Sequence, residues 1–418
     1  MSRIKYIAAF GIFGIITTEF GVIGILPQLA RHYNRSIEKT GILLSAFALV
    51  IALFGPWITL FLSRHNRKNL MLVTIALFII SNLISAMDPS FPILLLARIL
   101  PAFLHPLYFS IAVAAAVETA PKGQEHKAMS IIFGGVSLAT VVGVPFATYM
   151  ADLFGWQASF LVSGAVNMLA WLSILFFIPS MPVLKPPSHG QQLQILINPS
   201  FLISAASVVL LLAAMFSIYS YFADYMQKVN GLNGAQISGM LMIFGIAGVA
   251  GNWIAGKLLS RNILLTMAIF LTGLAIIYIL LYFNGLHLTR SGFTGAGYAG
   301  SRFTQPETVQ PASLATMILI GIWGFVHTGC FLISQTWISV AAPGAKVFAN
   351  SLGVSFGNLG LSMGTAISGW VIVNSGIHQV PWVSVALVVT SLILVFVKAG
   401  IGYKNRRTCV TGQNPQNS

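Results

Sequence analysis

Two ionisable residues, Glu19 and Arg98, lie inside long apolar runs of the sequence, where charged side chains are rare. The whole chain contains only eight Asp and Glu residues. A charge among apolar residues is costly, so such residues often bind ions, protons or polar ligands. We therefore predict that Glu19 binds a proton and a cationic or polar substrate in competition, while Arg98 tunes or transmits its protonation state. The alternative is a static ion pair that only fixes helix packing.

Two histidines form a second candidate pair. His105 lies in the segment AFLHPLYF (102–109), which resembles GFVHTGCF (324–331) around His327. Imidazoles change charge near neutral pH, so two histidines facing one cavity would add proton-binding groups to it. Alternatively, each histidine is a hydrogen-bonded packing group within its own helix.

Asp224 and Tyr221 lie near the expected outer end of another apolar run, in a stretch with several tyrosines. Tyrosines at this depth are typical of the aromatic belt at a membrane surface. The second interpretation is an outer gate in which Asp224 and Tyr221 take part.

The composition of the chain indicates which elements position these residues. Of 418 residues, 56% are hydrophobic and only 7% are charged, against roughly 25% charged in soluble domains. A bilayer accepts such a surface, because lipid contacts the apolar side chains while helices satisfy their own backbone groups. We therefore predict an all-α membrane protein.

The formal net charge of +14 does not indicate nucleic-acid binding here. Most Lys and Arg residues lie in short gaps between apolar runs, as expected for orientation signals and contacts with anionic lipids. The two cysteines, Cys330 and Cys409, suggest neither a disulfide framework nor a metal site. The apolar run after Lys5 is too long for a secretory signal, so we predict a retained first helix.

Twelve apolar runs are long enough to cross a bilayer, which takes about 20 residues. They lie near 6–26, 41–62, 70–87, 92–118, 128–150, 158–178, 201–226, 236–259, 262–283, 313–340, 346–373 and 380–401. The predicted domains are an N-terminal six-helix bundle (1–178), a cytoplasmic linker (179–200), a C-terminal six-helix bundle (201–401) and a cytoplasmic tail (402–418). Lys and Arg are more frequent in the connections on the side of the N-terminus, which predicts that both termini are cytoplasmic.

Three local matches reveal an internal repeat. Segments around Trp57 and Trp253, around the two histidines, and around Gly135 and Gly353 match in the same order in both halves. Parallel six-helix repeats are known in transporters, and this repeat predicts two pseudo-symmetric bundles. The spacing between matched segments is longer in the second half, so we assign 284–312, rich in Gly, Ser and Thr, to an outside insertion.

Four segments of the sequence match motifs of a known transporter family. They are TTEF with GILP (17–27), LSRHNRK (62–68), RILPAF (98–103), and GVP with FGW (143–156). With them the chain resembles the major facilitator superfamily, specifically its twelve-span drug/proton antiporter branch, which includes sugar-efflux, arabinose-efflux-like and purine-nucleoside-efflux proteins. The resemblance covers nearly the whole chain apart from 284–312 and the tail. It implies the major facilitator fold, with a central cavity at which spans 1 and 4 face each other.

The family's conformational motifs are matched only in part. The residues at the motif positions are Ser63, Arg64, Arg67, Lys68, Gly143, Pro145, Gly256 and Arg261. Ser63 stands where the family usually has an acid, and Ser260 replaces the same acid in the second copy. Ala147 stands where the antiporter signature commonly has another glycine. These departures weaken the implied latch and the implied antiport.

We predict a proton-coupled secondary transporter that exports a small organic compound of the drug, sugar or nucleoside class by alternating access. The alternatives are a sugar or nucleoside uptake or uniport carrier, and a non-transporting receptor or scaffold. The expected partners are the substrate, protons and membrane lipids, with no nucleic acid, cofactor or metal, and we expect a monomer in the bacterial cytoplasmic (inner) membrane. No enzyme or ATP-driven pump is expected: HExxH and CxxC patterns are absent, and Leu258 replaces the Ser or Thr of a phosphate-binding loop.

Overall fold

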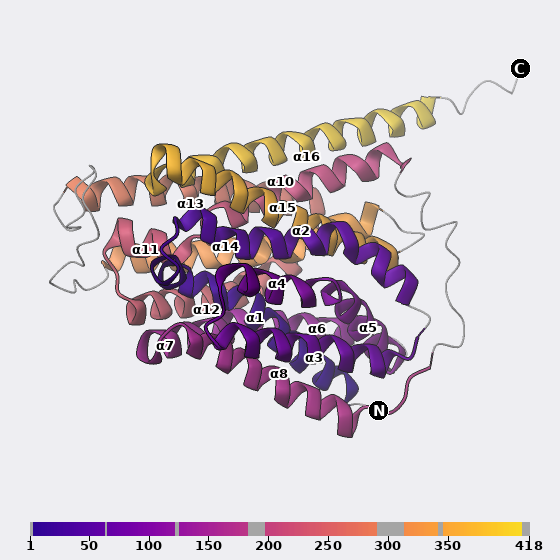
Figure 1. Ribbon diagram of the computed structural model, residues 1–418. Coiled ribbons are helices and arrows are strands. Elements are labelled where there is room, and N and C mark those ends of the chain that lie inside the picture. The colour runs from indigo at the N-terminus through magenta and orange to yellow at the C-terminus, as the bar shows by residue number, and fades with distance from the viewer. Residues whose placement is uncertain are drawn as a thin grey trace, which may run out of the picture.

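The computed structural model describes residues 3–62, 65–121, 125–182, 197–290, 313–341 and 346–411 (Figure 1). It contains twelve helical segments that are long and apolar enough to cross a membrane, which confirms the predicted all-α membrane fold. The start of α1 (Ile4–His32) and the end of α16 (Val380–Thr411) lie at the same end of the bundle. We call this the inner end, because the sequence predicts both termini to be cytoplasmic, and we call the opposite end the outer end.

The first six spans contain two interrupted helices. The elements are α1, α2 (Ile37–Leu62), α3 (Arg67–Ala86), α4 (Phe91–Ala102), α5 (His105–Glu118), α6 (Glu125–Leu138), the π-helix η1 (Ala139–Gly143), α7 (Val144–Phe154) and α8 (Gln157–Phe177). Span 4 is divided into α4 and α5 next to Pro101 and Pro106. Span 5 passes through η1 just before Pro145, whose missing N–H leaves a gap in the α-helical hydrogen-bond pattern.

The last six spans differ from the predicted runs at three places. The elements are α10 (Pro199–Tyr219), α11 (Phe222–Asn230), α12 (Gly234–Leu259), α13 (Ile263–Arg290), α14 (Leu314–Ala341), α15 (Lys346–Ser375), η4 (Ile377–Gln379) and α16. The run predicted over 201–226 is broken, because α10 ends at Tyr219 and Ser220 bonds the Thr365 hydroxyl at 2.6 Å. The helices α13 and α16 extend past their predicted ends at 283 and 401.

The extension of α13 places residues 284–290 in a helix, although the sequence assigned them to the inserted loop. Asn284 and Leu288 are one helical turn apart and face the rest of the bundle. The Asn284 amide donates to Thr316 Oγ1 on α14 at 3.1 Å, and Leu288 is buried. These tertiary contacts hold the turn in helical form, and the remaining residues 291–312 lie outside the described part of the chain.

The most deeply buried spans are α1 and α10, which are the first spans of the two halves. Around them, α1 packs on α7 and α8, and α10 packs on α15 and α16. The halves meet where α2 packs on α15 and where α7 packs on α12. Residues of α1 and α10 are therefore the ones best placed to act at the centre of the molecule.

Candidate functional site

A cavity of about 170 Å³ lies between the two halves. Its walls come from α1, α5, α6 and η1 of the first half and from α10, α12, α14 and α15 of the second. Water in the liquid occupies about 30 Å³ per molecule, so the space suits a small molecule. Glu19, His105 and His327 all line it, and we take this cavity as the candidate site.

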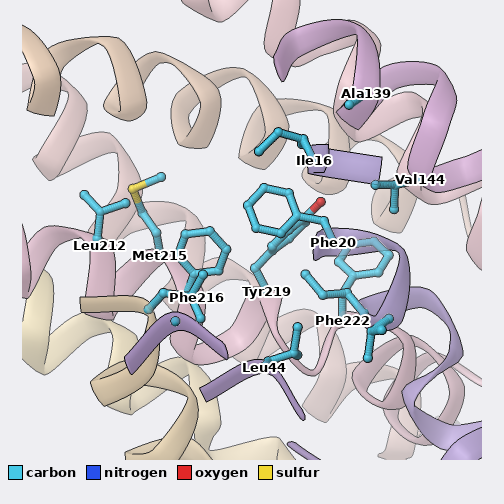
Figure 2. Packing of buried hydrophobic residues seen from close by; sticks show 14 of the residues in the cluster. Ile16, Phe20, Leu44, Ala139, Val144, Leu212, Met215, Phe216, Tyr219 and Phe222 are labelled. Atoms are coloured by element: carbon cyan, nitrogen blue, oxygen red, sulfur yellow. The ribbon is translucent and has the colours of Figure 1, made fainter. Parts of the chain in front are cut away.

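Aromatic side chains close the cavity toward the outer end. The Phe20 ring lies 5.5 Å from the Phe216 ring and 6.3 Å from the Tyr219 ring, measured between centroids. Figure 2 shows these three rings together between α1 and α10. Farther out, the Ser238 hydroxyl of α12 donates to the Pro145 carbonyl of α7 at 2.7 Å. The described state is thus closed outside, and α1 and α10 supply the closing rings.

Glu19 is paired with His105. The Nε2 atom of His105 lies 3.1 Å from Glu19 Oε2, and both side chains are almost fully buried. The imidazole makes no hydrogen bond of good geometry to any described residue, so the contact is ionic when the imidazole is protonated. Sequence analysis missed this pair, although a signal was available. His105 follows Arg98 by seven residues, or about two helical turns, so both face α1.

Arg98 does not form the static ion pair with Glu19 that was the alternative interpretation of these two charges. No ion pair of Arg98 occurs within the described ranges. Its guanidinium instead donates to the backbone carbonyls of Thr18 and Glu19 at 3.4–3.5 Å and lies near the Phe47 and Phe160 rings. Arg98 therefore reaches the Glu19 backbone, whereas the Glu19 carboxylate turns into the cavity toward His105.

Thr18 is the centre of a buried polar cluster that sequence analysis also missed. Its Oγ1 accepts hydrogen bonds from the amides of Asn82 in α3, at 3.0 Å, and Asn167 in α8, at 2.9 Å. Its carbonyl accepts from Arg98 of α4. Spans 3, 4 and 6 therefore all bond to the residue that precedes Glu19, which fixes the rotation of α1 about its axis.

His327 lies in the second half, opposite the pair formed by Glu19 and His105. It is 1% exposed and surrounded by aromatic rings, and neither ring nitrogen has a hydrogen-bond partner among the described residues. The two histidines therefore line one cavity in different settings. His105 faces a carboxylate, whereas His327 faces rings.

Tyr221 and Asp224 lie outside the cavity, at the break between α10 and α11. The Tyr221 hydroxyl donates to the Thr365 carbonyl at 3.1 Å, and Asp224 pairs with Lys228 at 3.0 Å. Each residue is 1% exposed. Such burial is unlike a membrane-surface belt, whose side chains face lipid and water.

Tyr221 also contacts both halves at two glycines. A Cβ built on Gly41 of α2 would lie 2.4 Å from the Tyr221 hydroxyl, and one on Gly369 of α15 would lie 2.6 Å from it. Only glycine leaves room for the hydroxyl at these two places. The side chain is therefore wedged between the halves at the outer end.

The motif residues after span 2 act within the first half. Arg67 forms an ion pair with Glu118 at the end of α5, with one N–O distance of 2.9 Å, and the Lys68 ammonium donates to the Leu175 carbonyl of α8 at 2.9 Å. Glu118 thus supplies an acid near the motif in which Ser63 replaces the usual one. Ser63 and Arg64 themselves lie outside the described residues.

The remaining motif residues mark close contacts of helices or an exposed turn. A Cβ on Gly143 would lie 2.1 Å from Thr17 Oγ1, so the glycine lets η1 approach α1. The Pro145 carbonyl accepts the bond that joins α7 to α12. Gly256 has only ordinary contact distances around it, and Arg261 is exposed just after α12.

The described residues contain no cluster of three or more His, Cys, Asp or Glu side chains that could hold a metal ion. Two GxSxG sequences, 353–357 and 360–364, lie within the continuous helix α15. A nucleophilic serine of that motif sits instead on a sharp strand-to-helix turn. The two sequences in α15 therefore lack the geometry of that motif.

Comparison with known proteins places the chain among transporters. The sequence model described as Major Facilitator Superfamily matches residues 8–305. Inner membrane transport protein YdhP of Escherichia coli K12 is 30% identical over 392 residues, which cover 94% of each chain. The uncharacterized MFS-type transporter YtbD of Bacillus subtilis is 28% identical over 92% of each chain. A probable sugar efflux transporter of Mannheimia succiniciproducens is 25% identical over 95% of this chain and 96% of its own.

Proposed function

Because the chain belongs to the major facilitator superfamily of secondary transporters, we propose that it exports a small organic compound in exchange for protons, by alternating access between its two halves. The chain is a multi-pass membrane protein and not an enzyme. One relative is named an inner membrane transport protein, which supports a place in the inner membrane, and another is named a probable sugar efflux transporter, which supports export. The drug, sugar or nucleoside class remains the proposed range of substrates.

The position of Glu19 carries this proposal. Glu19 is the one acidic residue among the described residues that line the cavity, and no Lys or Arg lines it. A carboxylate so little exposed to water is costly to keep ionised without a partner. His105 supplies one at 3.1 Å. The pair can therefore gain or lose a proton, or release its carboxylate to a substrate, at the point where the two halves meet.

Alternating access then follows from competition for one carboxylate. In the state closed outside, a cationic or polar substrate enters from the inner end and contacts Glu19, which favours the deprotonated form. Opening to the outside lets the substrate leave and lets a proton neutralise Glu19. The neutral form no longer holds the substrate, and the protein returns to the inner side to release its proton. Tyr221 and Asp224 act as the outer gate in this scheme.

The test uses purified protein in liposomes that contain a pH-sensitive dye. Wild type, Glu19→Gln and a matched control, Asp88→Asn, are compared while drugs, sugars and nucleosides are offered in turn. Asp88 is an acid outside the cavity that pairs with His32 at 2.7 Å. We expect substrate-driven proton flux in wild type and in Asp88→Asn, and at least about a hundredfold less in Glu19→Gln, as for removal of a proton-transfer group.

Two outcomes would contradict the proposal. Substrate movement without proton flux in wild type would indicate a uniport carrier and reduce Glu19 to a binding or packing role. Normal proton-coupled transport by Glu19→Gln would remove Glu19 from the coupling mechanism. The direction of transport is read from the same liposomes by imposing the proton gradient from either side.

A further inference from the structure

His327 is enclosed by five aromatic rings at the closed end of the cavity. We call these residues, together with His327, the aromatic box. The centroid distances from His327 are 5.0 Å to Tyr219, 5.2 Å to Phe244, 5.6 Å to Phe331, 6.0 Å to Phe216 and 6.1 Å to Trp323. The rings come from α10, α12 and α14, so three spans of the second half converge on one imidazole.

The imidazole of His327 has unused hydrogen-bonding capacity. Both nitrogens are buried and have no partner among the described residues, yet the residue lines the cavity. A neutral imidazole offers one donor and one acceptor. Buried polar groups in proteins are nearly always hydrogen-bonded. The bound state is therefore expected to supply a partner to the imidazole.

From these two features we propose that the aromatic box is a substrate subsite for a planar heteroaromatic ring that carries a hydrogen-bond donor beside an acceptor. Four of the five rings line the cavity together with His327, and Trp323 packs behind them. The faces and edges of these four match an aromatic ring, since such rings attract each other in stacked and edge-to-face contacts. The N–H of the ligand donates to the acceptor nitrogen of His327, and its neighbouring acceptor pairs with another polar side chain of the cavity. This inference rests on the proposed function only in taking the cavity as the substrate site.

The box is unsuited to a sugar ring. Apart from the His327 nitrogens, its side chains offer as polar atoms only the Tyr219 hydroxyl and the Trp323 indole N–H. A hexose would bury several hydroxyls there without partners, and each unpaired buried hydroxyl weakens binding. A heteroaromatic ring has one polar edge and otherwise apolar surface, so it fits the same walls without that cost.

The rest of the cavity indicates what the ring carries. Asn252, Thr328 and Asn358 line the second half beside the box, and Asn358 Oδ1 has no partner among the described residues. Glu19 and His105 face them from the first half. A polar substituent on the heteroaromatic ring would lie among these groups. The aromatic box therefore selects the ring, and the proton-binding pair acts on the polar end.

Equilibrium binding tests this subsite without any transport. Carbostyril, a bicyclic lactam with adjacent N–H and C=O groups, is compared by titration calorimetry with N-methylcarbostyril and with methyl glucoside. The proteins, in lipid nanodiscs, are wild type, His327→Phe and the control His287→Phe, which changes an exposed histidine of α13. His327→Phe keeps a ring in the box and removes both nitrogens.

We expect wild type and His287→Phe to bind carbostyril at least about tenfold more tightly than N-methylcarbostyril, because only carbostyril has an N–H to donate to His327. We expect this preference to disappear in His327→Phe, and methyl glucoside to bind more weakly than either lactam. Equal binding of the two lactams by wild type, tighter binding of the glucoside, or no binding of carbostyril at millimolar concentration would overturn the proposal. A preference that persists in His327→Phe would show a steric cause and would also overturn it.

The comparison separates this inference from the proposed function. Binding in nanodiscs needs no proton gradient, so it can succeed even if transport proves uncoupled. We expect Glu19→Gln to retain the preference for carbostyril over its N-methyl derivative, because Glu19 lies outside the box. The wild-type comparison also needs no variant, so poor folding of His327→Phe cannot hide the outcome.

Discussion

At the residue scale, the neighbouring residues Thr18 and Glu19 of α1 have different roles. Glu19 turns into the cavity and meets His105, whereas Thr18 turns away from it and bonds Asn82 and Asn167. Arg98 binds the backbone of both residues. The polar cluster around Thr18 therefore holds the carboxylate in its direction, and it acts through position rather than by touching substrate.

Thr18→Val tests this positioning. Valine has the same shape but removes the acceptor of two buried amides. Both amides keep a second hydrogen-bond acceptor. We therefore expect the free energy of unfolding to fall by about 1 kcal/mol, near the low end for buried groups that lose a hydrogen-bond partner. Thermal unfolding in detergent measures this loss. The control is Ser173→Ala, whose hydroxyl bonds only its own helix. An unchanged midpoint in Thr18→Val would show that the cluster does not hold α1.

At the scale of elements, the break between α10 and α11 places Tyr221 where a continuous helix would not. Its hydroxyl lies against Gly41 of the first half and Gly369 of the second. The same break lets Ser220 bond Thr365 of α15. The outer closure thus depends on a short irregular segment with two glycines opposite it, and small changes there should alter how often the outer end opens.

Gly41→Ala should open the outer end more often. Its Cβ would lie 2.4 Å from the Tyr221 hydroxyl, and Tyr221→Phe should relieve most of that overlap. The reporter is Thr140→Cys, placed in the cavity in a cysteine-free background, and an impermeant maleimide is added from outside. We expect this cysteine to react faster in Gly41→Ala. In Gly41→Ala combined with Tyr221→Phe, we expect a rate nearer that of the background. Gly134→Ala is the control, because nothing lies within 4 Å of its added Cβ. Equal rates in all variants would argue against a Tyr221 gate.

At the scale of the whole molecule, the two halves enclose one cavity, and contacts between the halves close it at the outer end. Glu19 and His105 come from the first half and the aromatic box comes from the second. Neither half alone forms the site. In the proposed mechanism, relative motion of the halves changes which side of the membrane the cavity faces.

Labelling of single cysteines tests the orientation and the open side together. In the cysteine-free background, Gln335→Cys lies in the cavity on α14, and Ser90→Cys is exposed just before α4. Without substrate, we expect an impermeant maleimide to modify Gln335→Cys mainly in inside-out vesicles and Ser90→Cys only in right-side-out vesicles. Modification of Gln335→Cys at equal rates from both sides would contradict a resting state closed outside.

The sequence by itself determined the twelve spans, because a bilayer demands apolar helices of about 20 residues whatever their tertiary contacts. It also singled out Glu19, since an acid in an apolar run is costly wherever the helix packs. These inferences concern composition and distance along one axis, which a linear sequence contains directly.

Only the tertiary structure decided which side chains meet. The partner of Glu19 depends on the rotation of α1 and on the division of span 4. His105 therefore meets the Glu19 carboxylate, while Arg98 bonds the Glu19 backbone. The break after Tyr219 and the helical residues 284–290 depend on bonds to Thr365 and Thr316 from other spans. The aromatic box needs residues of three spans far apart in sequence. In a membrane, the rotation of each helix about its axis is set mainly by side-chain packing against neighbouring spans. The sequence pattern within a single span does not determine that packing.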